Sequence, residues 1–419
     1  MHVLDTIAGA GIVSVRDALL ARQAAGHRVC RLESGDPSFA LPRHIADALE
    51  RAIRDGHTHY TAGAGIPALR EAAASKLVRE NRLPNVAPTD VFVTNGAMHG
   101  LYVVFRALVA PCLPDSEEVI LPDPTWTETA DNVTLAGGRP VRVPIFDGAA
   151  GTVRPLVGRD AADDEWALRV REAISPRTRA IVVNSPHNPT GEVWTEGQLR
   201  ALVALAAEHD LWIVSDEAYE HVIFHDARHV SPGSFGYPRV LSIYSMSKSY
   251  AMSGLRLGYV VCPAPAGSRT AEGVGAAPPA GACATNRQVA ERIAKLLRCT
   301  INGVNSATQW AGVAALGGPQ DCTRTMAEEY ERRRDLLFSG VERLPWLQPV
   351  RPAGAFYLWA RVNDARWPTG WDLTNHLITY GVGSAPGEVF GPAGRGWVRF
   401  AFACPTDQIA EAAERLAAL

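Results

Sequence analysis

Lysine is scarce in this chain of 419 residues, where it occurs only at Lys76, Lys248 and Lys295. Any covalent chemistry on a lysine amine is therefore limited to three positions. The basic residues are mostly arginine, and the formal net charge is −3 at pH 7. This balance gives no sign of a nucleic-acid partner or of binding to a membrane surface.

Long apolar runs are also absent. No run approaches the roughly 20 residues that a membrane-spanning helix needs, and the N-terminus lacks the basic and apolar segments of a secretory signal. The seven cysteines are scattered and never form a Cys-x-x-Cys pair, which argues against a disulfide framework or a zinc site. The histidines within residues 221–229 match no recognised metal-ligand spacing. We expect a soluble, cytoplasmic protein without a bound metal.

Between about residues 90 and 262, short runs rich in Val and Ile alternate with helix-like stretches. This alternation predicts a three-layer α/β sandwich, in which helices cover a mostly parallel sheet. Ligands bind such sheets beyond the carboxyl ends of the strands. The expected strands are 91–94, 117–123, 140–145, 179–186, 211–219, 240–247 and 257–263.

The pattern changes after about residue 300, where helical runs are followed by short strands near 356–362 and 397–403 and by a final helix. We expect residues 301–419 to form a smaller α+β domain, packed against an N-terminal segment, 1–40. Residues 41–300 then form the large domain. Within it, the Gly/Ala/Pro-rich segment 263–284 is interpreted as a flexible surface insertion, with a lid over the active site as the alternative.

The stretch SMSKSYAMSGLRLGY (245–259) places Ser245, Lys248 and Arg256 between two expected strands. It resembles the Schiff-base motif of the class I/II aminotransferases, which belong to fold type I of the enzymes that use pyridoxal 5′-phosphate (PLP). The resemblance implies that Lys248 bonds the cofactor covalently, while Ser245 and Arg256 hold its phosphate. A guanidinium fork suits a phosphate dianion.

Two further motifs, NSPHNPTG (184–191) and SDEAY (215–219), lie at the ends of expected strands. By the same resemblance, Asn188 and Tyr219 bind the phenolic oxygen of the cofactor, and Asn188 also contacts the substrate carboxylate. Asp216 is the implied partner of the ring nitrogen. A carboxylate at that nitrogen keeps it protonated, so the ring accepts electrons from the substrate. Lys248, Asp216 and Tyr219 are the predicted catalytic residues.

The remaining cofactor contacts come from TNGAMHG (94–100) and DPTWTETA (123–130). The resemblance implies that backbone N–H groups of Ala97 and Met98 face the phosphate at a helix N-terminus, where the helix dipole favours negative charge. It also implies that Trp126 stacks on the ring. Tyr60, in HYTAGAGIPALREA (59–72), is expected to reach the phosphate of a neighbouring subunit, so a homodimer is implied.

Substrate contacts are expected from both ends of the chain. The resemblance implies that Gly35, in SGDPSF, lays its backbone over the substrate carboxylate, which Arg399, in GWVRFAFA, clamps. An arginine in an apolar strand is costly to bury without an anionic partner. Phe356, in PAGAFYLWA, is expected to line the site. Some relatives specific for dicarboxylates carry lysine where this chain has Met98, and a Met cannot bind a distal carboxylate. Strict aspartate or glutamate specificity is therefore not expected unless another arginine, such as one in the 263–284 insertion, takes over that contact.

These roles predict transamination between an amino acid and a keto acid, with the Lys248 amine as the base that removes the α-proton. The motifs determine carbanion formation but not its fate. Elimination, replacement or cyclisation, as in aminocyclopropane-carboxylate synthases, is therefore the alternative. A third reading, a transcription regulator with an aminotransferase-like domain, is disfavoured because such regulators carry an N-terminal DNA-binding domain and this chain begins almost directly at the aminotransferase pattern.

Overall fold

The computed structural model describes residues 3–7, 11–84, 86–109, 116–147, 154–224, 227–263 and 284–419. Most of the segment predicted as an insertion lies outside these residues, so both interpretations of it stay predictions. No helix in the described ranges is long and apolar enough to cross a membrane. The cysteines with described side chains are free thiols: Cys30, Cys262, Cys299, Cys322 and Cys404.

The central element is a seven-stranded sheet with the order β1-β9-β8-β7-β6-β2-β3. Its pairs are parallel except for those of β9, which is antiparallel to both of its neighbours. The predicted α/β class with a mostly parallel sheet is confirmed. The strands are β1 (Val91–Thr94), β2 (Glu118–Asp123), β3 (Arg139–Pro144), β6 (Thr178–Asn184), β7 (Trp212–Asp216), β8 (Val240–Ser245) and β9 (Gly258–Val261), and a separate hairpin pairs β4 (Phe146–Asp147) with β5 (Arg154–Pro155).

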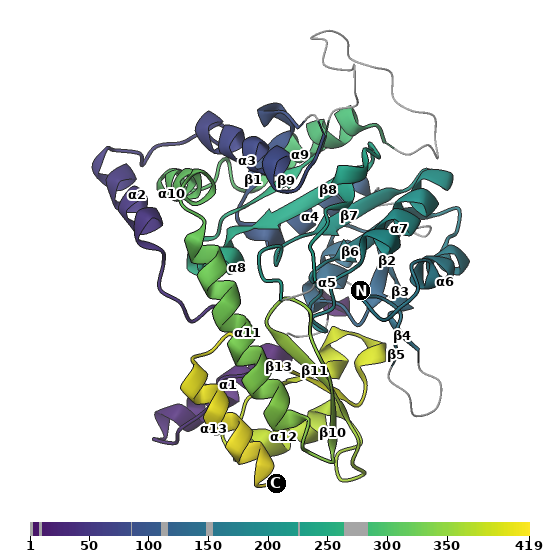
Figure 1. Ribbon diagram of the computed structural model, residues 1–419. Coiled ribbons are helices and arrows are strands. Elements are labelled where there is room, and N and C mark those ends of the chain that lie inside the picture. Colours follow the sequence, from purple (N-terminus) through teal and green to yellow (C-terminus); the bar gives the residue numbers. More distant parts are fainter. Residues whose placement is uncertain are drawn as a thin grey trace.

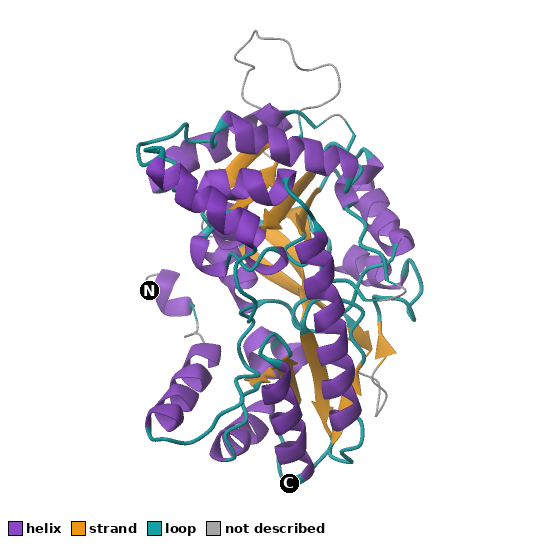
Figure 2. Ribbon diagram, turned by 60° about the vertical axis from the view of Figure 1, so that its left-hand side comes forward, coloured by secondary structure: helices purple, strands orange, loops and turns teal. Residues whose placement is uncertain are grey.

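Helices cover both faces of this sheet (Figure 2). Successive strand residues alternate between the faces, so Leu121 packs with one set of helices and Ile120 with the other. Because both faces of the sheet are buried, its strands carry Val and Ile on both faces and appear in the sequence as continuous apolar runs. One face carries α4 (Gly96–Leu108), α5 (Thr127–Leu135) and α9 (Asn286–Thr300), and the other carries α6 (Glu165–Ala173), α7 (Glu196–Glu208), α3 (Pro67–Arg79) and α10 (Ser306–Gly317), with α2 (Arg43–Arg54) packed on α10.

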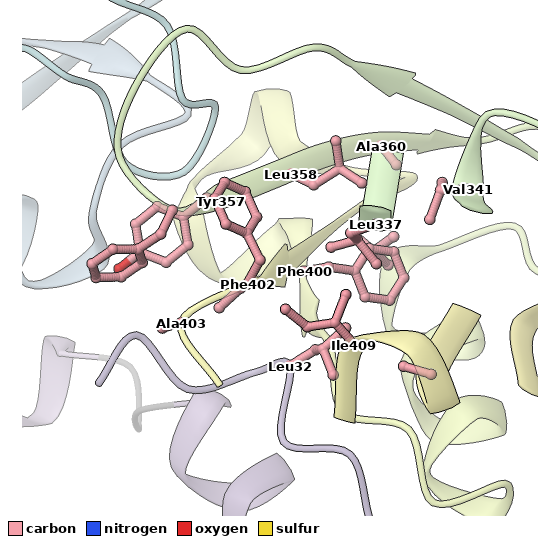
Figure 3. Close-up of a cluster of buried hydrophobic side chains, with 14 of the residues drawn as sticks. Leu32, Leu337, Val341, Tyr357, Leu358, Ala360, Phe400, Phe402, Ala403 and Ile409 are labelled. Carbon is pink, nitrogen blue, oxygen red and sulfur yellow. The ribbon is translucent and has the colours of Figure 1, made fainter. Parts of the chain in front are cut away.

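A second, antiparallel sheet has the order β10-β11-β13-β12 and lies below the large sheet in Figure 1. Its own core includes Leu337, Phe400 and Ile409 (Figure 3). The N-terminal helix packs against this unit, while the boundaries at residues 40 and 300 stay predictions. The elements are α1 (Gly11–Ala24), α11 (Asp321–Val341), β10 (Leu347–Val350), β11 (Tyr357–Val362), α12 (Gly370–Thr379), β12 (Ala385–Pro386), β13 (Trp397–Ala401) and α13 (Thr406–Ala417), and the short helix α8 (Met246–Ser249) follows β8.

Candidate active site

A cavity of about 330 Å³ lies at the carboxyl edge of the large sheet, where the strand-end loops meet residues of the second unit. The loops after β1, β2, β6, β7 and β8 all contribute to it, together with α1 and β13. Its lining is Ile12, Val13, Arg16, Arg31, Glu33, Ser34, Gly35, Asp36, Ala97, Met98, Leu101, Trp126, Asn184, Asn188, Asp216, Ala218, Tyr219, Ser245, Ser247, Lys248, Arg256, Tyr357 and Arg399. All the predicted site residues except Tyr60 and Phe356 are in this set.

One end of the cavity combines a guanidinium with the start of a helix. Arg256 has a left-handed backbone with φ of 54°, and its Nη1 donates to the carbonyl oxygen of Ser253 over 2.8 Å. Gly96 begins α4 with φ of 79°, and a Cβ atom there would lie 2.5 Å from Nη2 of Arg256. A side chain at this position would displace the Arg256 guanidinium, and the positive φ favours glycine. Ser245 ends β8, and its hydroxyl accepts from the amide of Ser247 over 3.2 Å.

The Lys248 amine projects into the same cavity and donates to the carbonyl oxygen of Gly35 over 2.8 Å. Burial lowers the pKa of Lys248 to about 8, and Arg256 and Arg399 act in the same direction while Asp36 opposes them. A side chain at Gly35 would collide with the hydroxyl of Tyr357. The neutral amine, which can act as a nucleophile or base, is thus accessible near physiological pH.

Asp216 ends β7 as a buried acid. Burial raises the pKa of its carboxyl to about 6, opposed by a hydrogen bond from the amide of Ala218 and assisted by Glu217. No cation among the described residues acts on this carboxyl. Asn184 donates to the Asp216 carbonyl over 3.0 Å and accepts from the Asn188 amide over 2.8 Å, so it joins the two loops.

Arg399 lies in β13 with an exposed fraction of only 1%. Its Nη1 donates to Oδ1 of Asn188 over 3.0 Å, and its Nη2 donates to the carbonyl oxygen of Glu33 over 2.9 Å. The Nε atom is buried without a hydrogen-bond partner among the described residues. Burial lowers the pKa of Arg399, although Tyr357, Tyr219, Glu128 and Glu33 oppose the shift. A buried guanidinium with an unused donor favours binding of an anion.

Two predicted residues lie elsewhere. The ring of Phe356 is fully buried in the core of the second unit, packed edge-on against Tyr219 at 5.3 Å between centroids. The next residue, Tyr357, lines the cavity, and its hydroxyl pairs with that of Tyr219 over 2.8 Å. Tyr60 is 89% exposed and lies outside the cavity of this single chain.

Part of the cavity wall is apolar. Trp126 lines it close to Phe390, with 6.4 Å between ring centroids, and the sulfur of Met98 accepts from Asn132 over 3.3 Å. Residues of α1 complete the wall: Ile12, Val13 and Arg16 lie on one helical face and all line the cavity.

Comparison with known proteins agrees with this geometry. The family model for aminotransferase class I and II matches residues 27–416. The chain belongs to the class I and II aminotransferase family. It is 35% identical to an aspartate/prephenate aminotransferase of Thermus thermophilus, over 97% of this chain and 94% of the relative. It is 32% identical to an aspartate aminotransferase of Geobacillus stearothermophilus, over 94% of this chain and 92% of the relative.

Solved structures of aminotransferases share the fold. The structure of the aspartate aminotransferase of Thermus thermophilus with maleate gives a TM-score of 0.84 at 34% identity, covering 99% of this chain and 98% of that one. As an aminotransferase of this family, the chain is a transferase. The named relatives favour transamination over the elimination or cyclisation alternative.

Proposed function

We propose that this aminotransferase binds PLP in the cavity at the carboxyl edge of the large sheet and exchanges amino groups between an L-amino acid and a 2-oxo acid. Class I and II aminotransferases are PLP-dependent. The residues present fit the cofactor, because the cavity offers a cationic cradle at one end, a buried acid without a cation and a lysine with a lowered pKa. Bound PLP supplies an aldehyde and an electron-accepting ring.

The cradle is proposed to hold the phosphate. Arg256 supplies a planar fork of donors, and the amides of Ala97 and Met98 lie at the N-terminus of α4, where the helix dipole favours an anion. The Ser245 hydroxyl adds a further donor at the end of β8. The close approach of Gly96 to Arg256 supports this assignment, since it brings helix amides and guanidinium to one point.

The buried acid is proposed to bind the ring nitrogen. Within the described part of the chain no cation acts on Asp216, so a protonated ring nitrogen would relieve the cost of its ionisation. In this arrangement Tyr219 and Asn188 bind the phenolic oxygen of the cofactor, and Trp126 stacks on its ring. Tyr357 orients Tyr219 through their paired hydroxyls.

The unused donor of Arg399 is the observation that carries the substrate assignment. Arg399 binds the α-carboxylate in this proposal, with Asn188 and the backbone of Gly35 beside it. Lys248, whose amine lies 2.8 Å from the Gly35 carbonyl, is then next to the α-carbon and moves its proton. Its lowered pKa makes the neutral form available for that task.

A homodimer is proposed to complete the site. Tyr60 is 89% exposed, which is unusual for an aromatic side chain and supports its burial against a second copy. By the family resemblance it would reach the phosphate bound to the neighbouring subunit. The free thiols support a reducing compartment, and the cytoplasm is the proposed location.

An amino-acid and oxo-acid screen with product mass spectrometry tests the proposal. We expect conversion of the amino donor to its 2-oxo acid and of the acceptor to its amino acid, in equal amounts. Aspartate is included because relatives are named for it, whereas Met98 favours donors without a distal carboxylate. An eliminated or cyclised product without amino transfer to the acceptor would contradict the proposal.

A further inference from the structure

The turn that follows β7 has two sides. Asp216, Ala218 and Tyr219 line the cavity. Glu217 and Glu220 do not, and instead join a buried polar network that connects the turn to α3 and β8. The same five residues thus carry two cofactor ligands of the proposed function and two acids outside the cavity.

The carboxylate of Glu217 is buried and is contacted by four polar side chains. Ser215 and His229 lie at 3.0 and 2.9 Å, Asn81 lies at 3.5 Å, and Ser231 makes a short contact. A carboxylate can accept about four hydrogen bonds. These contacts fix the position of the Glu217 side chain and of the turn that carries it.

The buried lysine of the network pairs with the other acid. Lys76 is 1% exposed, and its amine donates to Glu220 over 2.5 Å and to Asn81 over 2.7 Å. The ligand atoms of Glu217, Glu220 and His229 lie within 4.8 Å of one another, as metal ligands would. Because the Lys76 ammonium already supplies the positive charge at Glu220, this cluster is an internal ion network and not a vacant cation site.

We propose that Glu217 is a positioning residue for the cofactor: it holds the turn that carries Asp216 and Tyr219, and its negative charge favours a proton on the cofactor nitrogen that faces Asp216. This inference rests on the proposed PLP site. The charge of Glu217 acts on Asp216, where it raises the pKa of that carboxyl. The combined negative charge of two adjacent acids favours a cation next to Asp216, the acid that faces the cavity.

Other titratable groups face Glu217 from each element packed against it. They are Lys76 on α3, Glu220 in the turn, His229 in the following loop, Tyr244 on β8 and Tyr259 on β9. Burial raises the pKa of Tyr244 and of Tyr259 well above the usual value, with help from Glu217 and Glu220, so both tyrosines remain neutral. Replacing Glu217 or Glu220 by glutamine removes one carboxylate with little change of shape. A comparison of the two variants therefore separates the effect of charge on the cofactor from the loss of protein stability.

The experiment compares Glu217→Gln and Glu220→Gln as PLP-loaded proteins. Each variant removes one carboxylate from the same network, so both are expected to melt at lower temperature than the unmodified protein. In a spectrophotometric pH titration of the bound cofactor, Glu217→Gln is expected to lower the midpoint by about 0.5 to 1 pH unit, because a nearby negative charge favours the protonated form. Glu220→Gln should move it by less than about 0.2 unit.

Two further variants complete the test. Glu217→Asp keeps the negative charge, so its titration midpoint should lie close to that of the unmodified protein, even if its melting temperature stays low. If Glu217→Gln does not fold, Ser231→Ala takes its place, because removal of one hydrogen-bond donor loosens the Glu217 side chain and should shift the midpoint in the same direction by less.

The outcomes distinguish this inference from the proposed function. Equal midpoints in the unmodified protein and in Glu217→Gln, with lowered melting temperatures, would show a purely structural role and overturn the inference alone. A PLP absorption band that is absent from the unmodified protein, or unchanged in Lys248→Ala, would instead contradict the proposed PLP site.

Discussion

Arg399 and Asn188 lie 211 positions apart in the chain, yet Nη1 of Arg399 donates to the side-chain oxygen of Asn188 over 3.0 Å. This contact joins β13 of the second unit to the loop after β6 of the large sheet. It brings the proposed carboxylate site and the proposed cofactor site together, so the relative position of the two units determines whether a substrate can react.

The first prediction concerns Arg399. Arg399→Lys removes the planar fork and should raise the KM for amino acids roughly 10- to 100-fold, as expected when a hydrogen bond to a charged group is lost. PLP affinity should change little. Arg361→Lys, on neighbouring β11 and outside the cavity, is the matched control and should leave KM unaltered. An unaltered KM in Arg399→Lys would exclude Arg399 from carboxylate binding.

The second prediction concerns the stability of the PLP-free protein. Burial raises the pKa of Asp216 from 3.8 to about 6, so the folded state holds a proton that the unfolded state has lost between these values. Asp216 therefore contributes stability below about pH 4 that is lost as pH rises through about 6. Asp216→Asn should then stabilise the PLP-free protein at pH 7 by roughly 2 to 3 kcal/mol, a difference that shrinks toward acid pH.

Urea unfolding of the two PLP-free proteins at neutral and acid pH measures this difference. The same variant should bind PLP more weakly, because an amide cannot balance a protonated ring nitrogen. A destabilisation of equal size at both pH values would contradict the assignment of Asp216 as a buried acid with a raised pKa.

The third prediction concerns substrate choice. Met98→Lys introduces a cation into the cavity wall and should raise the ratio of kcat/KM for aspartate over that for leucine by roughly tenfold, about 1.4 kcal/mol. Met98→Gln has similar length without charge and serves as control. If both variants change the ratio equally, charge at this position does not select the substrate.

The fourth prediction concerns the dimer. Homodimers of the Lys248→Ala variant and homodimers of the Tyr60→Ala variant should each lose most of the transaminase activity. Mixed dimers formed by co-expression should regain it, because one of the two sites then contains both original residues. A mixture that stays as inactive as its parents would place Tyr60 outside the site.

The strand pattern and the motif loops could be predicted from sequence because both are local signals. Asn188, Asp216 and Lys248 each follow a strand whose carboxyl end meets the same sheet edge, and the structure brings all three to one cavity. The position of Phe356 was harder to predict. Phe356 and Tyr357 are both buried rings of the second core, yet only Tyr357 also lines the cavity, and the local sequence does not distinguish the two.

Contacts between distant segments left no local signal. Lys76 lies in an amphipathic run that gives no sign of complete burial, and its partner Glu220 is 144 positions away. The α1 residues Ile12, Val13 and Arg16 meet the cavity only because the N-terminal helix packs on the second unit. Glu217 was adjacent to a predicted site residue, and its role followed only from the donors that surround it.

The central claim is that Lys248 bonds the cofactor, and peptide mapping after borohydride reduction of the PLP-loaded protein tests it most directly. The chain has only three lysines, so each falls on a distinguishable peptide. The account predicts the added cofactor mass on the peptide that contains Lys248 and on no other. A label on the Lys76 or Lys295 peptide, or no label at all, would contradict it.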